Sequence, residues 1–315
     1  MEVRDVLPKD AIPSIDDPTF AKRYDWESDD ELLVVEGEPT KAYPIRILNF
    51  HEIVNDVVNE TPIAITWCPL CASAVVYERT VDGSELTFGV SGKLADDDLV
   101  LYDQETESEW KQSLGTCIAG KYEGNELTVV PAGVVTSEQF ESAFPDGIVL
   151  QPPHTESEAA SDTDEPAPVD YDDNPYEAYF QSDEFGLDGH REGNSRTWDR
   201  ADIHPKTAVL GIERDGDAIG YPRPTVRSAG GTVSDTVGGV SVLVVATDTG
   251  MYAYENPGIE FELVEDRLIG GGITWNPVTG AGEDGRFLDR MPARRLFAFT
   301  WQDDHGTGSF YKLPS

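Results

Sequence analysis

The second half of this 315-residue chain repeats landmarks of its first half in the same order. The tripeptide Ala42-Tyr43-Pro44 returns as Gly220-Tyr221-Pro222, and the β-branched run Ile63-Ala64-Ile65 returns as Val242-Leu243-Val244. A later tryptophan followed by glycines, Trp110, is answered by Trp275. Matches that keep one order at a long, nearly constant spacing are the sequence signature of a duplicated structural unit. We therefore expect two copies of one unit.

Within each unit the pattern predicts short strands and few helices. Glu31 to Val35 is a β-branched strand, and Asp82-Gly83 between two alternating runs predicts a hairpin. Thr136 followed by Gln139 predicts the capping box of a short helix. The apolar spacing from Pro44 to Asp56 predicts an amphipathic helix with His51 and Glu52 in its middle. The expected fold class is α+β, rich in strands, with an internal duplication of one mixed β unit and few short helices.

The chain divides by composition into three parts. Residues 1–150 form the first unit, and residues 176–315 form a second, degenerate unit. The segment between them, residues 151–175, has almost no large apolar residues and many acidic residues and prolines. Such a segment cannot bury enough surface to fold, so we expect an acidic linker or loop.

The chemistry concentrates in the sequence from Ile63 to Val76, IAITWCPLCASAVV. Cys68 and Cys71 stand at a C-x-x-C spacing, which lets two sulfur atoms close on one metal ion or on each other. The corresponding stretch of the second unit, residues 246–250, contains no cysteine, and the region that answers His51 and Glu52 falls near residues 228–230. The first unit is therefore expected to carry the site, and the second to serve as scaffold or lid.

Three uses of these thiols remain open from the sequence. The first is a metal site in which Cys68, Cys71, His51 and Cys117 hold a thiophilic ion, zinc or copper, with or without enzymatic action on a small molecule. The second is thiol–disulfide exchange by Cys68 and Cys71. The third is a non-enzymatic binding or assembly protein with structural cysteines, since buried free cysteines are common. Loss of bound metal on replacing both C-x-x-C cysteines would distinguish the first use.

Three further polar residues lie close to these motifs in the sequence. Arg46 and Glu52 share the expected helix with His51, and Lys93 follows a strand in Ser91-Gly92-Lys93. They are weaker candidates because surface ion pairing is the common use of such residues. No nucleotide-binding pattern is present, so no nucleotide cofactor is expected.

The charge of the chain excludes some partners. Against 60 acidic residues there are 23 basic ones, a formal net charge of -37. Nucleic acids and anionic membranes bind clustered Lys and Arg, so neither is an expected partner. Acidic residues spread along the whole chain are typical of proteins adapted to concentrated salt, where screening removes most self-repulsion. The start of the chain has no apolar signal region, so a cytoplasmic, halophilic protein is expected.

Four motifs in register resemble one established family. These are AYPIRILNFHEIVND, TWCPLCASAVVYER, LTFGVSGKL and LVLYDQETESEWKQ, and together they are similar to the family known as domain of unknown function 3179. The resemblance is strong from Pro8 to about Leu150 and looser in the second half. It implies no activity, because the family has none established. The family usually has glycine after the second cysteine, where this chain has Ala72.

Overall fold

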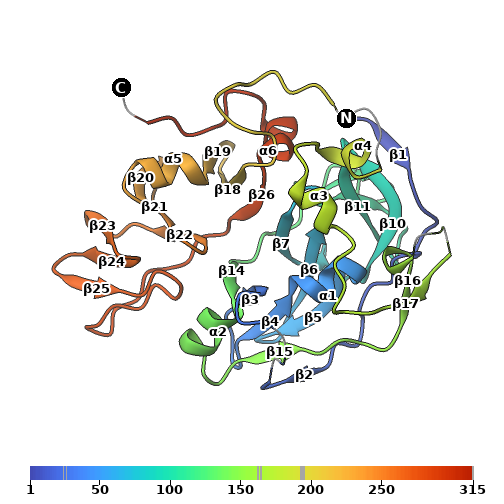
Figure 1. Cartoon of the computed structure of the whole chain (residues 1–315), viewed down its shortest axis with the longest axis horizontal. Coiled ribbons are helices and arrows are strands. Elements are labelled where there is room, and N and C mark those ends of the chain that lie inside the picture. The colour runs from blue at the N-terminus through green and yellow to red at the C-terminus, as the bar shows by residue number, and fades with distance from the viewer. Residues whose placement is uncertain (24, 26, 162, 164, 192–195, 314–315) are drawn as a thin grey trace.

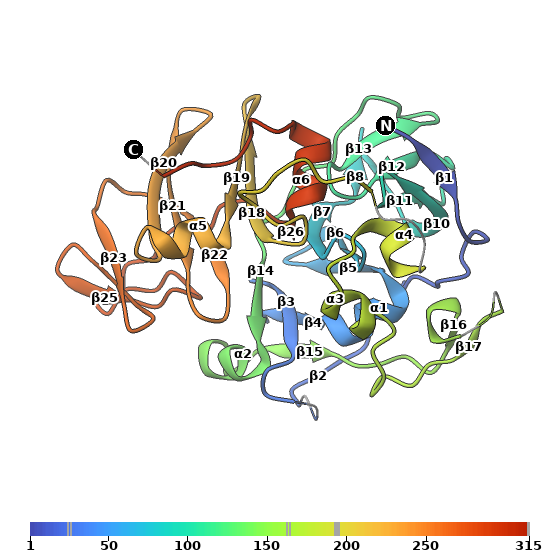
Figure 2. The ribbon, with the colours of Figure 1, turned by 45° about the horizontal axis from the view of Figure 1, so that its top comes forward.

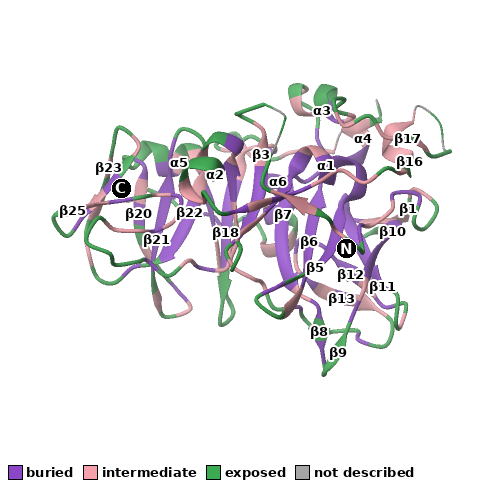
Figure 3. Cartoon of the chain, turned by 90° about the horizontal axis from the view of Figure 1, so that it is seen from below, coloured by how far each residue is buried: buried purple, intermediate pink, exposed green. Residues whose placement is uncertain are grey.

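The structure is a computed structural model that describes all residues except 24, 26, 162, 164, 192–195 and 314–315. Strands dominate it, as the sequence predicted, and the helices are short (Figure 1). Among the described residues, no helix combines the length and the apolar character that crossing a bilayer requires. The interiors of the sheets are buried and the connecting loops are exposed (Figure 3).

One sheet joins the two halves of the chain. Its six strands run in the order β19 (Asp217–Pro222), β18 (Ala208–Arg214), β26 (Arg294–Phe297), β7 (Ser73–Glu78), β6 (Thr61–Cys68) and β5 (Ile53–Val58). The strands from the two halves meet where β26 pairs with β7, through Arg295 and Ala74. The two halves therefore share a sheet, while the division of the chain into units stays a prediction.

Two five-stranded sheets complete the first half. One has the order β1 (Val3–Asp5), β10 (Phe88–Ala95), β11 (Asp98–Asp103), β12 (Glu109–Lys111) and β13 (Thr116–Ala119). The other has the order β14 (Gly133–Thr136), β3 (Glu31–Val35), β4 (Lys41–Pro44), β15 (Ile148–Leu150) and β2 (Phe20–Ala21). The predicted hairpin is present as β8 (Thr80–Val81) and β9 (Ser84–Glu85).

The second half adds two three-stranded sheets and most of the remaining helices. The strands are β20 (Thr232–Val237), β21 (Val240–Ala246) and β22 (Met251–Glu255), then β23 (Phe261–Val264), β24 (Arg267–Gly270) and β25 (Ile273–Trp275). The helices of the chain are α1 (Ile45–His51), α2 (Ser137–Ala143), α3 (Glu177–Gln181), α4 (Gly186–His190), α5 (Arg223–Ser228) and α6 (Ala298–His305). Helix α6 lies where the two halves meet (Figure 2).

The helix expected from Pro44 to Asp56 is half as long as predicted, and its second part is wrong. Helix α1 ends at His51, Glu52 adopts a left-handed conformation with φ 57°, and the chain continues directly into β5. The β-branched residues after Glu52 favour a strand, and all six residues of β5 find partners on β6. By contrast, the capping box of α2 is confirmed, with the Thr136 side chain accepting from the backbone N–H of Gln139.

The acidic segment 151–175 is packed onto the first half rather than only solvated. Its described residues form the strand pair β16 (Glu156–Ser157) and β17 (Ala167–Pro168) and a short 3-10 turn. The Ser157 hydroxyl is buried and donates to the carbonyl of Phe50 at 2.8 Å. Composition alone gave no sign of this docking, because the few contacts that hold the segment come from distant residues.

Two glycines make room for the tryptophan that anchors α6, and we expect Gly211→Ala to destabilise the fold. Gly211 on β18 and Gly220 on β19 face the indole of Trp301, which is fully buried, and a methyl group at Gly211 would overlap that ring. Overpacking of this kind costs about 2 kcal/mol of unfolding free energy. Gly308→Ala is the matched control, since no atom lies within 4 Å of the added carbon. Equal denaturant midpoints for the two variants would contradict the prediction.

Candidate metal centre

The C-x-x-C sequence is the tight turn between two neighbouring strands. Cys68 ends β6 and pairs with Ser73, the first residue of β7, so Cys71 lies inside the turn between them. Ala72 has φ 44°, a left-handed value that glycine adopts more readily than alanine. Both thiols are buried, Cys68 at 1% and Cys71 at 0% exposure, and all three cysteines of the chain are free.

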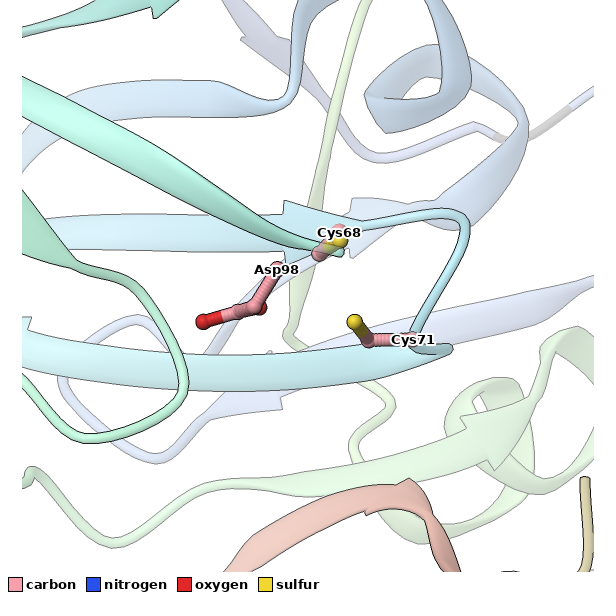
Figure 4. Close-up of side chains that lie close together, drawn as sticks. All are labelled: Cys68, Cys71 and Asp98. Atoms are coloured by element: carbon pink, nitrogen blue, oxygen red, sulfur yellow. The ribbon is translucent and has the colours of Figure 1, made fainter. Parts of the chain in front are cut away.

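A third group, Asp98, joins the two sulfurs. It is the first residue of β11 and is fully buried. One carboxylate oxygen of Asp98 and the two sulfur atoms all lie within 4.8 Å of one another (Figure 4). The sequence prediction missed Asp98, because a run of three aspartates before a strand looks like a solvated turn. Its position directly before the buried run Leu99 to Tyr102 was the available signal.

The carboxyl group of Asp98 has an incomplete set of partners. One oxygen accepts from the backbone N–H of Ser113 at 2.8 Å, and the other finds no hydrogen-bond partner among the described residues. Burial raises the pKa of Asp98 to about 6, while the ammonium group of Lys111 opposes the rise. A buried carboxyl oxygen without a donor is costly unless a proton or a cation meets it.

The two thiols are held in their protonated form. Burial is the main reason that the pKa of each is raised, and for Cys71 the neighbouring Cys68 and the charge of Asp98 raise it further. Cys71 donates its thiol hydrogen to the carbonyl of Asp97 at 3.4 Å. The first turn of α6 lies beside this turn, since the N–H of Phe297 donates to the carbonyl of Cys71 at 2.8 Å. A hydrogen bond with Thr300 opposes the rise in the Cys71 pKa without cancelling it. These thiols are therefore poor nucleophiles as they stand, and a cation between them would favour their ionised form.

His51, predicted to be a ligand, is used elsewhere. Its Nδ1 lies 2.9 Å from the carbonyl oxygen of Pro13, and its Nε2 lies 2.7 Å from the hydroxyl of Tyr171. A carbonyl only accepts, so Nδ1 carries a proton, while Nε2 is occupied by the tyrosine. The ring thus fastens the acidic segment onto α1, and the structure does not bring it together with the two sulfurs.

Cys117 also lies apart from the pair. It stands on β13 opposite Trp110, and its thiol donates to the carbonyl of Ala119 at 3.3 Å. Among the described residues, the group of possible ligands contains Cys68, Cys71 and Asp98 but neither Cys117 nor His51.

The three weaker candidates have different surroundings. Arg46 pairs with Asp30, with 2.9 Å between Nη2 and Oδ1, and also donates to the carbonyl of Tyr171. Lys93 pairs with Glu109 at 2.6 Å and faces a cavity of about 570 Å³. Glu52 and Cys68 line the same cavity, although Cys71 and Asp98 do not. Of the three, Glu52 is the one placed beside the thiol pair.

Behind Cys71 lies a buried polar region to which the second half contributes. The ammonium group of Lys111, on β12, lies 2.5 Å from the carboxylate of Asp304, on α6, and both side chains are nearly inaccessible. Several buried polar atoms in this region have no partner among the described residues: Ser73 Oγ, Gln112 Oε1, Ser113 Oγ, Thr300 Oγ1 and Asp304 Oδ2. Sequence reasoning missed Lys111 and Asp304, which are 193 positions apart. Buried atoms of this kind are usually met by ordered water.

The docking of His51 predicts a loss of stability in acid. Burial lowers its pKa to about 4, against an ordinary value near 6.5. The folded state therefore binds fewer protons, so the stability due to this difference is present above pH 6.5 and disappears as the pH falls from 6.5 to 4. The loss reaches about 3 kcal/mol. Denaturant titrations at constant salt should show that the free energy of unfolding falls more steeply with acid in the wild type than in His51→Gln. Parallel pH profiles of the unfolding free energy for the two proteins would refute the prediction.

The family model described as protein of unknown function (DUF3179) matches residues 9–308 of the chain. The match runs through both halves and through the segment between them. No curated protein and no solved structure matches the chain.

Proposed function

Because the chain belongs to the DUF3179 family, whose function is unknown, we propose a function from its own geometry. Cys68, Cys71 and Asp98 bind one thiophilic metal ion, zinc or copper(I). The observation that carries the proposal is the buried cluster of two thiols and one carboxylate oxygen within 4.8 Å of one another. Two sulfurs and one oxygen are a ligand set that suits zinc, and copper(I) would rely on the two sulfurs.

Electrostatics supports a cation at this place. All three groups are acids whose pKa values are raised by burial, and the ammonium group of Lys111 is already paired with Asp304. A metal ion would let both thiols and the carboxyl lose their protons together. Thiol–disulfide exchange has less support, because raised pKa values disfavour the attacking thiolate.

The proposed ion has three protein ligands, which is the pattern of catalytic zinc sites with an open fourth position. Cys68 lies at the wall of the 570 Å³ cavity, so the open position would face that cavity.

The test is elemental analysis of protein purified in high salt without added metal, together with a thiol count. About one zinc or copper per chain is expected. Absence of metal, also after adding zinc or copper(I), would overturn the proposal.

We also propose that the two halves arose by duplication of one unit. The order strand, strand, helix, then three strands runs from β3 to β7 and again from β18 to β22. Tyr43 donates to Asp56 at 2.7 Å, and Tyr221 donates to Asp235 at 3.0 Å, at the corresponding places. In this alignment the turn with Cys68 and Cys71 corresponds to the turn between Ala246 and Met251, which has the same length and contains no cysteine. The metal site would then belong to the first copy alone.

A further inference from the structure

The backbone at Glu52 has a conformation that favours glycine. Glu52 follows α1 with φ 57° and ψ −29°. Its N–H donates to the carbonyl of Leu48 and its own carbonyl accepts from the N–H of Trp67, each at 2.8 Å. Trp67 directly precedes Cys68, so these bonds tie Glu52 to the strand that presents the thiol. A side chain with a Cβ atom is strained in this region of backbone space.

The corresponding position in the second half has the residue that the backbone prefers. Gly231 follows α5 with φ 86°, and its carbonyl accepts from the N–H of Ala246 at 2.8 Å. The local turn therefore needs no side chain, and glycine satisfies it without strain. Glutamate in the first half therefore places a carboxyl group where the turn itself requires no side chain.

Glu52 is one of the residues that line the cavity. Glu52 is 7% exposed, and no hydrogen bond or ion pair of its carboxyl is found among the described residues. Burial raises its pKa to about 8, and the charges of Glu158 and Asp98 add to the rise.

The rest of the cavity has the character of a small-molecule site. Its apolar wall is formed by Val6, Leu7, Ile12, Leu94, Leu99 and Leu187. Concave sites of several hundred Å³ with an apolar lining and a few convergent polar groups are typical of ligand pockets. The polar and charged side chains of its lining include Glu52, the Cys68 thiol, Lys93, Glu158, His190 and Arg191.

We propose that Glu52 is the catalytic acid–base residue of a hydrolytic site in this cavity, acting on a small ester or amide. This inference rests on the proposed function: a metal ion held by Cys68, Cys71 and Asp98 would supply the polarisation of the substrate carbonyl. Water is the second reactant. Glu52 takes one proton from water while the water oxygen bonds to the carbonyl carbon, and it returns that proton to the leaving oxygen or nitrogen as the scissile bond breaks. No group is oxidised or reduced.

The experiment uses full-length, zinc-loaded protein in high salt with 4-nitrophenyl acetate as the probe. Hydrolysis by the wild type above the metal-free background is expected, and Glu52→Gln should lower kcat about 100-fold while one zinc per chain stays bound. Glu141→Gln, an exposed carboxyl on α2, is the matched control and should keep the wild-type rate.

A second variant separates catalysis from folding. Glu52→Gly gives this turn the residue found at Gly231, so its Tm should equal or exceed that of the wild type while hydrolysis is lost. Full activity of Glu52→Gln or Glu52→Gly would overturn the role of Glu52. A wild type that binds zinc but leaves the ester intact would overturn the hydrolytic reaction and leave the metal site standing. Hydrolysis that needs Glu52 in protein unable to bind metal would instead remove the metal site and keep the acid–base residue.

Discussion

Replacing Cys68 and Cys71 together by serine is expected to abolish tight zinc binding. The thiolates supply two of the three proposed ligands, and serine hydroxyls stay protonated at neutral pH and bind zinc weakly. Since thiolate-rich zinc sites bind with free energies of about 10–16 kcal/mol, we expect the dissociation constant to rise at least about 1,000-fold. Competition with a coloured chelator, followed by elemental analysis of the dialysed protein, measures the change.

Two single variants make this result specific. Cys117→Ser removes a buried thiol that lies on β13, outside the cluster, and should leave about one metal ion per chain. Asp98→Asn keeps the shape of the third ligand but removes its charge, so it should weaken binding by at least about tenfold. If the double serine variant retained its metal, or if Cys117→Ser lost it, the proposed ligand set would be wrong.

The second large effect is expected from Lys111→Met, which removes the cation of a buried ion pair. The side chains of Lys111 and Asp304 are 3% and 1% exposed. The carboxylate of Asp96 also lies near the Lys111 ammonium group, at 3.6 Å. Breaking a buried pair by deleting one partner leaves an uncompensated charge and costs about 3–5 kcal/mol of unfolding free energy. Urea unfolding at constant high salt measures the loss.

The controls for this prediction come from the surface and from the partner residue. Lys22 and Asp146 form an ion pair in which both side chains are mostly exposed, so Lys22→Met should change stability by less than about 1 kcal/mol. Combining Lys111→Met with Asp304→Leu removes both charges of the buried pair and should recover part of the loss. Similar losses for Lys111→Met and Lys22→Met would show that the buried pair is not important for stability.

The local features of the fold could be predicted from short stretches of sequence. The capping box of α2, the hairpin at Asp82-Gly83 and the strand at Glu31 to Val35 each depend on residues close together in the chain, and each is present. The expected helix failed at Glu52, where the apolar spacing suited a helix or a strand equally. The residues after Glu52 form a strand because they pair with β6, and this partner lies outside the stretch of sequence from which the helix was predicted.

The candidate site shows the same division. The sequence by itself determined that Cys68 and Cys71 lie close together, because only two residues separate them and both belong to one tight turn and the strand end that enters it. Only the tertiary structure showed that Asp98, from a neighbouring sheet, lies beside the two thiols. It also showed that Lys111 pairs with Asp304 from the other half of the chain, and that His51 contacts Tyr171. Spacing along the chain fixes which side chains meet across a turn. Contacts between residues far apart in sequence depend on how sheets pack and pair, which local patterns do not specify.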